Sequence, residues 1–149
     1  MRAVIQRVSR ARVSVAGSLI GEIDRGILLL LGISIRDTKA DAKYLLDKTL
    51  NLRIFDDPGG RMNESLVDQG AGMIVVSQFT LYGDTRKGRR PSYIEAAPPE
   101  DANRLYEFFV SEARKQVSNV ATGRFQAMMD VELVNDGPVT LLLDSERNF

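Results

Sequence analysis

Gly26-Ile27-Leu28-Leu29-Leu30-Leu31-Gly32 is the stretch that decides the fold, because it holds the longest apolar run of the chain. The run is far shorter than the roughly 20 apolar residues that a membrane helix needs. A short apolar run bounded by glycines is most simply a strand buried on both faces, although periodicity alone leaves a helix open. We therefore predict a buried strand here and expect no membrane partner.

The segments around this run also have clear periods. Residues 2–8, 11–15 and 18–23 alternate as strands do, with a turn at Ala16-Gly17. After the run, Thr38 and Asp41 form a capping-box pattern, and apolar residues then recur on one helical face, which predicts a helix over residues 39–51. A further buried strand is predicted from Met73 to Val76.

The second half of the chain predicts one helix and two strands. Residues 82–99 are rich in Gly, Pro and charge, and are typical of a loop. A helix begins near Pro98-Pro99, and strands follow around 125–134 and 139–143, with a turn at 135–138 between them. The whole chain, residues 1–149, is expected to be a single α+β domain with a mostly antiparallel sheet or barrel and two main helices.

The composition excludes much of the usual hydrolytic chemistry. The 149 residues include no His and no Cys, which removes catalytic triads, thiol nucleophiles and imidazole zinc sites. A carboxylate-only Mg²⁺ or Ca²⁺ site stays open in principle, but no acidic cluster marks one, so we expect no metal. There is no P-loop or dinucleotide motif, hence no expected cofactor. The N-terminus has no uninterrupted signal-peptide core, so we expect a cytoplasmic protein.

One candidate site is Ser77-Gln78-Phe79-Thr80, at the end of a predicted buried strand. Hydroxyls, an amide and turning backbone N–H groups at such a point suit the binding of a carbonyl and its oxyanion. By spacing alone, Ser77 and Thr80 equally suit the ordinary task of satisfying backbone groups at a strand end.

Three further segments are candidates for function, and each also has a purely structural interpretation. Lys plus Arg and Asp plus Glu both total 20, so RNA contact requires a local patch. The segment 86–90, with Arg86, Lys87, Arg89 and Arg90, is the best such patch, or else a solvated loop. Composition makes Gly137-Pro138 an ordinary turn, since only about 5–6% of X-Pro bonds are cis. Phe125, Met128 and Met129 either line a pocket or belong to a core strand.

Two segments together resemble the D-aminoacyl-tRNA deacylase family. They are Ser77-Gln78-Phe79-Thr80 and Asn135-x-Gly137-Pro138-Val139-Thr140, and residues 1–8 and 88–92 are similar to that family as well. The resemblance covers essentially the whole chain. It implies hydrolysis of the ester of D-aminoacyl-tRNA at the 3′ end, with glycyl-tRNA also accepted, as chiral proofreading in translation quality control.

The resemblance further implies a homodimer with its active sites at the interface. Gly137-Pro138 would be cis and would reach into the partner's site, where its carbonyls leave no room for an L side chain. Phe125 and Met129 would line the adenosine pocket beside Ala102, and Arg7 would brace the Gly-Pro loop.

Two catalytic mechanisms remain open at this point. Thr80, or Ser77, could act as a nucleophile, but no evident base activates a hydroxyl here. Backbone N–H groups of Phe79 and Thr80 could instead stabilise the oxyanion while the 2′-hydroxyl of the terminal adenosine helps activate water, which the resemblance favours. Rival functions are a hydroxyl-nucleophile hydrolase of other small esters and a non-catalytic RNA-binding module.

Overall fold

The apolar run forms the strand at the centre of the sheet. The computed structural model describes residues 1–149. In it, β3 (Gly26–Gly32) pairs antiparallel with β1 (Arg2–Val15) on one side and parallel with β6 (Gly72–Ser77) on the other. Ile27, Leu28, Leu29 and Leu31 are each no more than 1% exposed, as expected for a strand covered on both faces. The prediction of a buried strand is confirmed.

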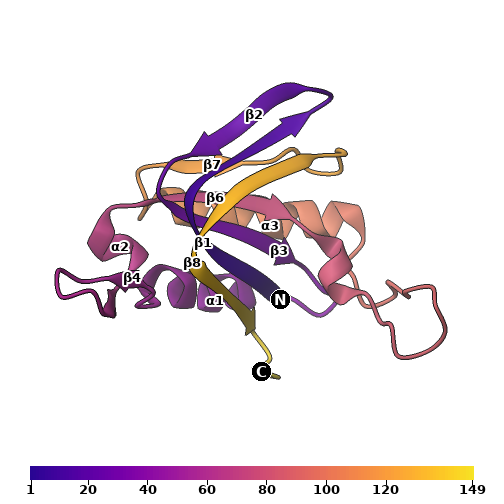
Figure 1. Ribbon diagram of the computed structural model, residues 1–149. Coiled ribbons are helices and arrows are strands. Elements are labelled where there is room, and N and C mark those ends of the chain that lie inside the picture. The colour runs from indigo at the N-terminus through magenta and orange to yellow at the C-terminus, as the bar shows by residue number, and fades with distance from the viewer.

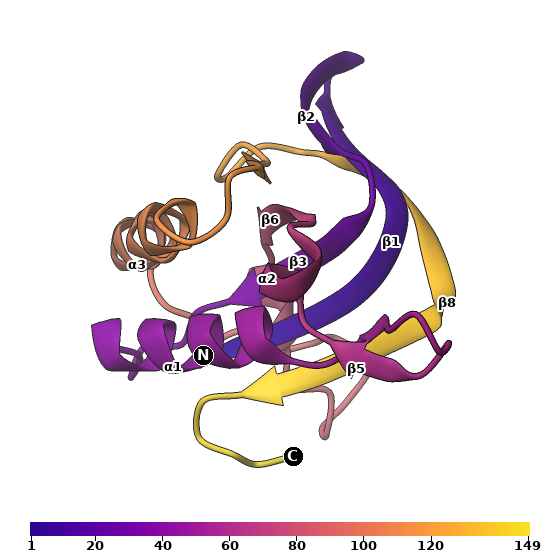
Figure 2. The same cartoon turned by 90° about the vertical axis from the view of Figure 1, so that its left-hand side faces the viewer.

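The sheet has the order β2-β1-β3-β6-β7, with β2 at Ser18–Ile23 and β7 at Val120–Thr122, and β8 (Asp130–Asp144) pairs with β1. One edge of β1 pairs first with β3 and then with β2, while β8 follows its other edge. The long strands β1 and β8 bend together, so that the sheet curls toward a barrel (Figure 2). The β8 strand therefore forms an edge of the sheet.

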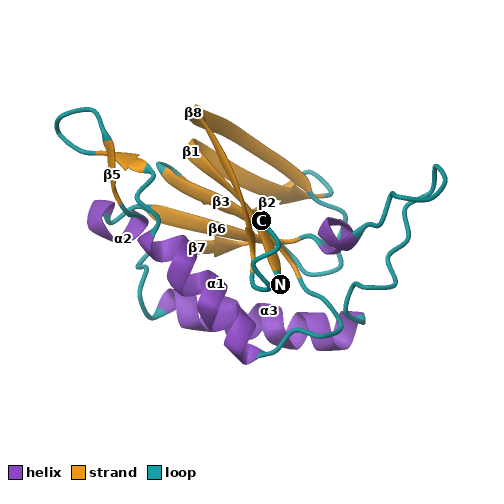
Figure 3. Cartoon of the chain, turned by 90° about the horizontal axis from the view of Figure 1, so that it is seen from below, coloured by secondary structure: helices purple, strands orange, loops and turns teal.

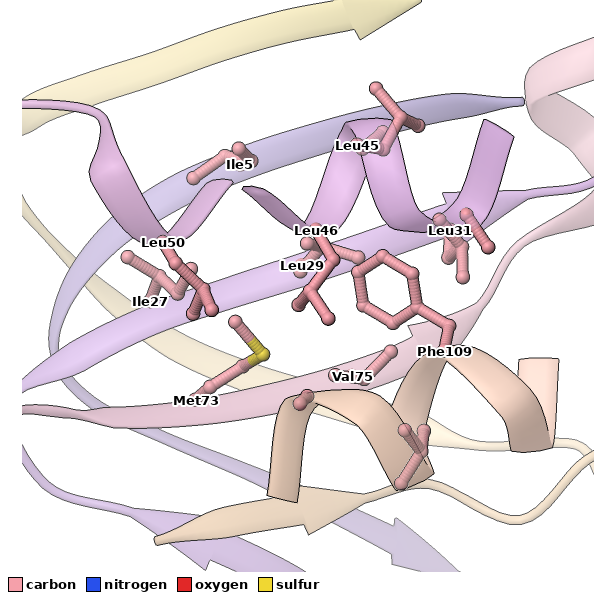
Figure 4. Packing of buried hydrophobic residues seen from close by; sticks show 14 of the residues in the cluster. Ile5, Ile27, Leu29, Leu31, Leu45, Leu46, Leu50, Met73, Val75 and Phe109 are labelled. Atoms are coloured by element: carbon pink, nitrogen blue, oxygen red, sulfur yellow. The ribbon is translucent and has the colours of Figure 1, made fainter. Parts of the chain in front are cut away.

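The helices α1 (Lys39–Asn51) and α3 (Pro99–Arg114) lie together on one face of the sheet (Figures 1 and 3). Thr38 and Asp41 make both bonds of the predicted capping box. Leu45, Leu46 and Leu50 of α1 and Phe109 of α3 point toward the sheet (Figure 4), where they belong to a core cluster of 23 buried residues. A smaller cluster of 7 buried residues lies apart from it. No helix is both long and apolar enough to cross a bilayer.

Short elements complete the chain: β4 (Phe55–Asp56), β5 (Met62–Glu64), α2 (Leu66–Gln69) and the 3₁₀ turn η1 (Phe79–Tyr82). None of them was predicted, and neither was β7, because two to four residues carry too little periodicity. The α+β class and the two main helices are confirmed. The mostly antiparallel sheet is confirmed as well, since β1 pairs antiparallel with β2, β3 and β8, while the pairings of β6 with β3 and β7 are parallel.

The predicted strands near the C-terminus need correction. Residues 125–129 lie outside any strand, and β8 runs without a break from Asp130 to Asp144 through the predicted turn. Its pairing with β1 shifts register twice between Gln6 and Arg10, which accommodates the Gly-Pro segment as a bulge rather than a chain reversal. The core-strand reading of Met128 is also wrong, because that side chain is 91% exposed.

Candidate functional site

The Ser77–Thr80 segment forms a tight turn at the carboxyl end of β6. Gln78 makes the last bond to β3, donating its backbone N–H to the carbonyl of Leu31 at 2.8 Å, and η1 begins at the next residue. The first N–H groups of a helix have no partner inside it. The N–H groups of Phe79 and Thr80 donate to no acceptor in the chain, and both residues are exposed. This leaves two adjacent donors at the surface, the requirement for an oxyanion site.

The side chains beside these donors include no base. The Gln78 side-chain amide donates a hydrogen bond to the Thr80 hydroxyl. An amide donor cannot accept the hydroxyl's proton, and Ser77 makes no side-chain hydrogen bond. No group of three or more His, Cys, Asp or Glu residues is arranged to hold a metal ion. The turn is therefore equipped to bind a developing negative charge rather than to activate a nucleophile.

The strands β3 and β1 hold η1 in place through Gly32 and Arg2. A Cβ on Gly32 would lie 2.9 Å from the Cβ of Leu81 and 3.1 Å from the carbonyl oxygen of Gln78, so the turn packs against β3 only because residue 32 is glycine. Arg2 donates from Nη1 to the Leu81 carbonyl at 3.0 Å and lies 4.6 Å from the centre of the Tyr82 ring. Burial raises the pKa of Tyr82, which keeps this ring neutral.

Aromatic residues from two other elements lie near the same end of β6. The Val75 carbonyl accepts from the Tyr106 hydroxyl at 2.8 Å and from the N–H of Gly123 at 3.2 Å. The Phe125 and Tyr106 rings are 5.8 Å apart between centres, and Ala102 lies one helical turn before Tyr106 on α3. Two of the predicted pocket residues, Phe125 and Ala102, are thus brought to one region.

Met129 differs from these pocket residues in its packing. Its sulfur lies 2.6 Å from the position that a Cβ on Gly123 would occupy, and it packs against the smaller core cluster. Phe125 packs against the main cluster instead. The two residues therefore do not share one packing environment.

Gly137 and Pro138 form an exposed bulge in β8, and the peptide bond between them is cis. The trans turn that composition alone favours is wrong. Gly137 has a φ of +143°, which favours glycine. The Asn135 side chain spans the bulge, because its Oδ1 accepts from the Val139 N–H at 2.7 Å and its Nδ2 donates to the Val139 carbonyl at 3.1 Å.

Arg7 lies beneath this bulge and is only 6% exposed. Its Nε donates to the Asp136 carbonyl at 2.8 Å and its Nη1 to the Ile54 carbonyl at 2.6 Å. The carboxylates of Asp56 and Asp136 lie 3.5 and 3.6 Å away and balance the buried charge. Arg7 thus ties the Gly-Pro segment to the β4 region. Sequence reasoning did not anticipate the bonds of Asn135, although Asn before a turn is a known signal of such side-chain bonding.

Within one chain the two candidate segments are far apart. Ser77 lies in register with Leu31, then Ala3, then Leu143, across three strand-to-strand steps, or about 14 Å. Pro138 lies five residues before Leu143 on β8, about 16 Å along the strand. One protomer therefore does not place Gly137-Pro138 beside Ser77–Thr80.

The basic loop follows η1 and extends away from the body (the long loop at the right of Figure 1). Asp84 and Ser92 close its base through two backbone bonds of 2.8 and 3.0 Å. Asp84 also pairs with Arg86 at 2.8 Å, and these bonds hold the pKa of the Asp84 carboxyl well below its usual range. Lys87, Arg89 and Arg90 form no ion pair. Three of the four predicted basic residues are therefore free to meet phosphate.

Comparison with known proteins shows the family of this chain. A family model described as D-Tyr-tRNA(Tyr) deacylase matches residues 4–144. A D-aminoacyl-tRNA deacylase from Desulfotalea psychrophila is 56% identical over 149 residues, covering 100% of both chains. Another from Thermosipho africanus is 58% identical over 149 residues, with the same coverage.

Two solved structures share the fold. One is titled c-Myc DNA Unwinding Element Binding Protein and is similar at a TM-score of 0.92, with 42% identity over 97% of this chain and 98% of that one. The other is titled as a probable eukaryotic D-amino acid tRNA deacylase and has a TM-score of 0.82, covering 95% of this chain and 97% of that one. At 18% identity, this second match shows the fold alone.

The fold, a site of backbone donors and hydroxyls, and full-length relatives named deacylases define a class of ester hydrolases. Within that class, this chain belongs to the D-Tyr-tRNA(Tyr) deacylase family.

Proposed function

We propose that this protein hydrolyses the ester bond of D-aminoacyl-tRNA and releases the free D-amino acid and tRNA. The observation that carries the proposal is the pair of unpartnered N–H groups of Phe79 and Thr80, on a turn with no histidine or thiol beside it. Such a site suits an activated ester, whose hydrolysis needs charge stabilisation more than a strong nucleophile. The proposed setting is the cytoplasm, where translation takes place.

The proposed reaction is direct attack by water. Water adds to the ester carbonyl carbon, and the resulting oxyanion accepts hydrogen bonds from the N–H groups of Phe79 and Thr80. The bond to the 3′ oxygen of the terminal adenosine then breaks, and that oxygen takes a proton. The neighbouring 2′-hydroxyl helps to activate the water, because no side chain of the protein is placed to do so. A single oxyanion donor is worth about 10²–10³ in rate, so two donors supply a large share of the acceleration.

The pocket residues and the basic loop have separate parts in this proposal. Ala102, Phe125 and Met129 would line the space for the terminal adenosine, supported by the position of Phe125 beside the end of β6. Arg86, Lys87, Arg89 and Arg90 would contact the tRNA backbone. Of these, the three without an ion pair are the stronger candidates for phosphate contact.

Selection of the D form is proposed to require a second copy of the chain. The Gly137-Pro138 bulge would enter the partner's site, where rigid carbonyls exclude an L side chain and tolerate a D one. Two observations support this. The bulge is exposed on the edge strand β8, and its own Ser77–Thr80 segment is too distant to meet it. Arg7 and Asn135 would keep the bulge rigid. Glycyl-tRNA would also be accepted, since glycine has no side chain to exclude.

The test compares D-tyrosyl-tRNA, L-tyrosyl-tRNA, glycyl-tRNA and the free ethyl ester of D-tyrosine in single-turnover assays. We expect hydrolysis of the first and third, with L-tyrosyl-tRNA and the free ester at the buffer rate. Hydrolysis of the free ester at a similar rate would favour a general esterase with a hydroxyl nucleophile. Binding of tRNA without hydrolysis would favour a non-catalytic RNA-binding module.

A DNA duplex is the matched control for nucleic-acid binding. One structural relative is titled as a DNA-binding protein, and the free cations of Lys87, Arg89 and Arg90 would attract either polymer. We expect weaker binding to the duplex than to tRNA at the same salt concentration. Tighter binding to DNA, with no deacylation, would overturn the proposed function.

A further inference from the structure

The η1 turn is contacted by the sheet on its inner side and by Tyr93 on its outer side. The inner contacts, from Gly32 and Arg2, come from strands of the sheet. On the outer side lies the ring of Tyr93, 5.0 Å from the Phe79 ring between centres and edge-on to it. A Cβ on Gly83 would lie 3.0 Å from Cε1 of Tyr93, so this ring also covers the end of the turn. Tyr93 therefore touches the residue whose N–H is one of the two free donors.

Tyr93 is also the residue that directly follows the basic loop. The loop is closed at its base by the Asp84 and Ser92 bonds, one residue before Tyr93. Just beyond Tyr93 the chain is tied to the body again, because Ala97 donates to the Ile33 carbonyl at 2.9 Å. Tyr93 thus lies between an extended basic loop, which Figure 3 shows projecting beyond the helices, and an anchored segment. Tyr93 therefore joins the base of the loop, at the preceding residue Ser92, to η1.

We propose that Tyr93 is a positioning residue that couples contact of the basic loop with tRNA phosphates to the orientation of the Phe79 and Thr80 donors. This rests on the proposed function. Phosphates bound by Lys87, Arg89 and Arg90 fix the base of the loop, and the Tyr93 ring then holds Phe79 so that its N–H points at the oxyanion. Binding energy from a remote part of the substrate is thereby used at the reacting carbonyl, and it appears in kcat rather than only in KM.

The experiment uses two substrates that share the reacting end. One is full-length D-tyrosyl-tRNA, and the other is the D-tyrosyl ester of the CCA trinucleotide, which cannot reach the loop. In the wild-type protein, the rate at saturation should be higher for the tRNA, by up to about tenfold, the range open to one aromatic contact. Equal saturating rates for the two substrates would overturn the coupling.

The variant Tyr93→Leu removes the ring and keeps apolar bulk. It should slow the saturating rate on tRNA to that of the trinucleotide ester, while the ester's own rate falls by a smaller factor. Tyr93→Phe, which keeps the ring, should behave as wild type on both. Ile94→Ala is the matched control, because Ile94 is the next residue and is 78% exposed. If Tyr93→Leu slows both substrates equally, Tyr93 is only structural support and the proposal is wrong.

A second variant tests the coupling from its other end. Replacing Lys87, Arg89 and Arg90 together by Ser should lower the saturating rate on tRNA to the level of the ester, in addition to raising KM. A higher KM with an unchanged saturating rate would contradict the proposal. Failure of the proposed function gives a different result, namely no hydrolysis of either substrate by the wild-type protein.

Discussion

At the scale of single residues, the surroundings of the Thr80 hydroxyl favour attack by water over attack by this hydroxyl. It accepts a hydrogen bond from the Gln78 amide, and no carboxylate or amine lies within bonding distance to remove its proton. A hydroxyl in that state is a weak nucleophile at neutral pH. The backbone N–H of the same residue is unpartnered, so in the proposed mechanism Thr80 would act through its main chain and not through its hydroxyl.

Thr80→Ala should therefore keep much of the deacylase activity, with a loss of less than about tenfold, the scale of one hydrogen bond. The measurement is the single-turnover rate on D-tyrosyl-tRNA. Thr80→Ser is the control, since it retains a hydroxyl. A nearly inactive Thr80→Ala beside an active Thr80→Ser would revive the nucleophile mechanism.

At the scale of elements, α3 and β6 are joined next to the site by Tyr106. Its hydroxyl bonds the Val75 carbonyl, and its ring packs near Phe125. Burial is the main cause that raises the pKa of Tyr106 to about 12. An unfolded chain releases this proton near pH 10, but the folded chain does so only near pH 12. The contribution to stability is therefore complete below pH 10 and is lost as the pH rises from 10 to 12.

Tyr106→Phe should cost only about 1 kcal/mol at pH 7, because the Val75 carbonyl still accepts from Gly123. The stability difference between wild type and Tyr106→Phe should shrink, or reverse, above pH 10. Urea denaturation at pH 7, 9 and 11 measures this difference, with Tyr93→Phe as the control for loss of a surface phenol. A difference that does not change with pH would show that the Tyr106 phenol is not protected by folding.

At the scale of the whole molecule, the two candidate segments lie apart in one chain, and the proposed dimer would bring them together. The edge strand β8 carries an exposed bulge and two exposed apolar side chains, Val134 and Leu142. Such an edge is suited to pairing with another chain. In a symmetric dimer, each copy would supply η1 to one site and the bulge to the other.

Mixing two defective variants tests this arrangement. Phe79→Pro removes one donor at the first position of η1, where proline fits a helix start. Gly137→Ala places a Cβ 2.8 Å from Cγ2 of Val139 at a φ of +143°, which displaces the bulge. Each variant alone should be impaired. After unfolding and refolding together, half of the dimers would be mixed, each with one intact site, so activity should return to roughly a quarter of wild type. Two controls are separate refolding and size measurement by light scattering. If activity does not recover, the two segments do not act across the dimer interface, and the proposed arrangement is wrong.

Local pattern was sufficient for the regular elements. The run from Ile27 to Leu31, the capping box at Thr38 and the apolar face of residues 39–51 each satisfy a rule that acts within a few residues, and each prediction is confirmed. Prediction from local pattern failed where pairing between distant strands overrides the preference of a short segment. Asn135-x-Gly-Pro has the composition of a turn, but β8 pairs with β1 on both sides of it. Residues 125–129 look like a strand, but no neighbouring strand pairs with them.

The sequence by itself determined the α+β class, the two main helices, the central strand and the exclusion of His and Cys chemistry, because these depend on composition and on spacing along the chain. Only the tertiary structure decided that Phe79 and Thr80 present free N–H groups, that Tyr93 covers their turn, and that Arg7 supports the bulge. It also decided that the bulge and the turn lie apart in one protomer. The reason is physical: periodicity reports which face of an element is buried, whereas hydrogen-bond partners and distances between distant segments depend on how the elements pack.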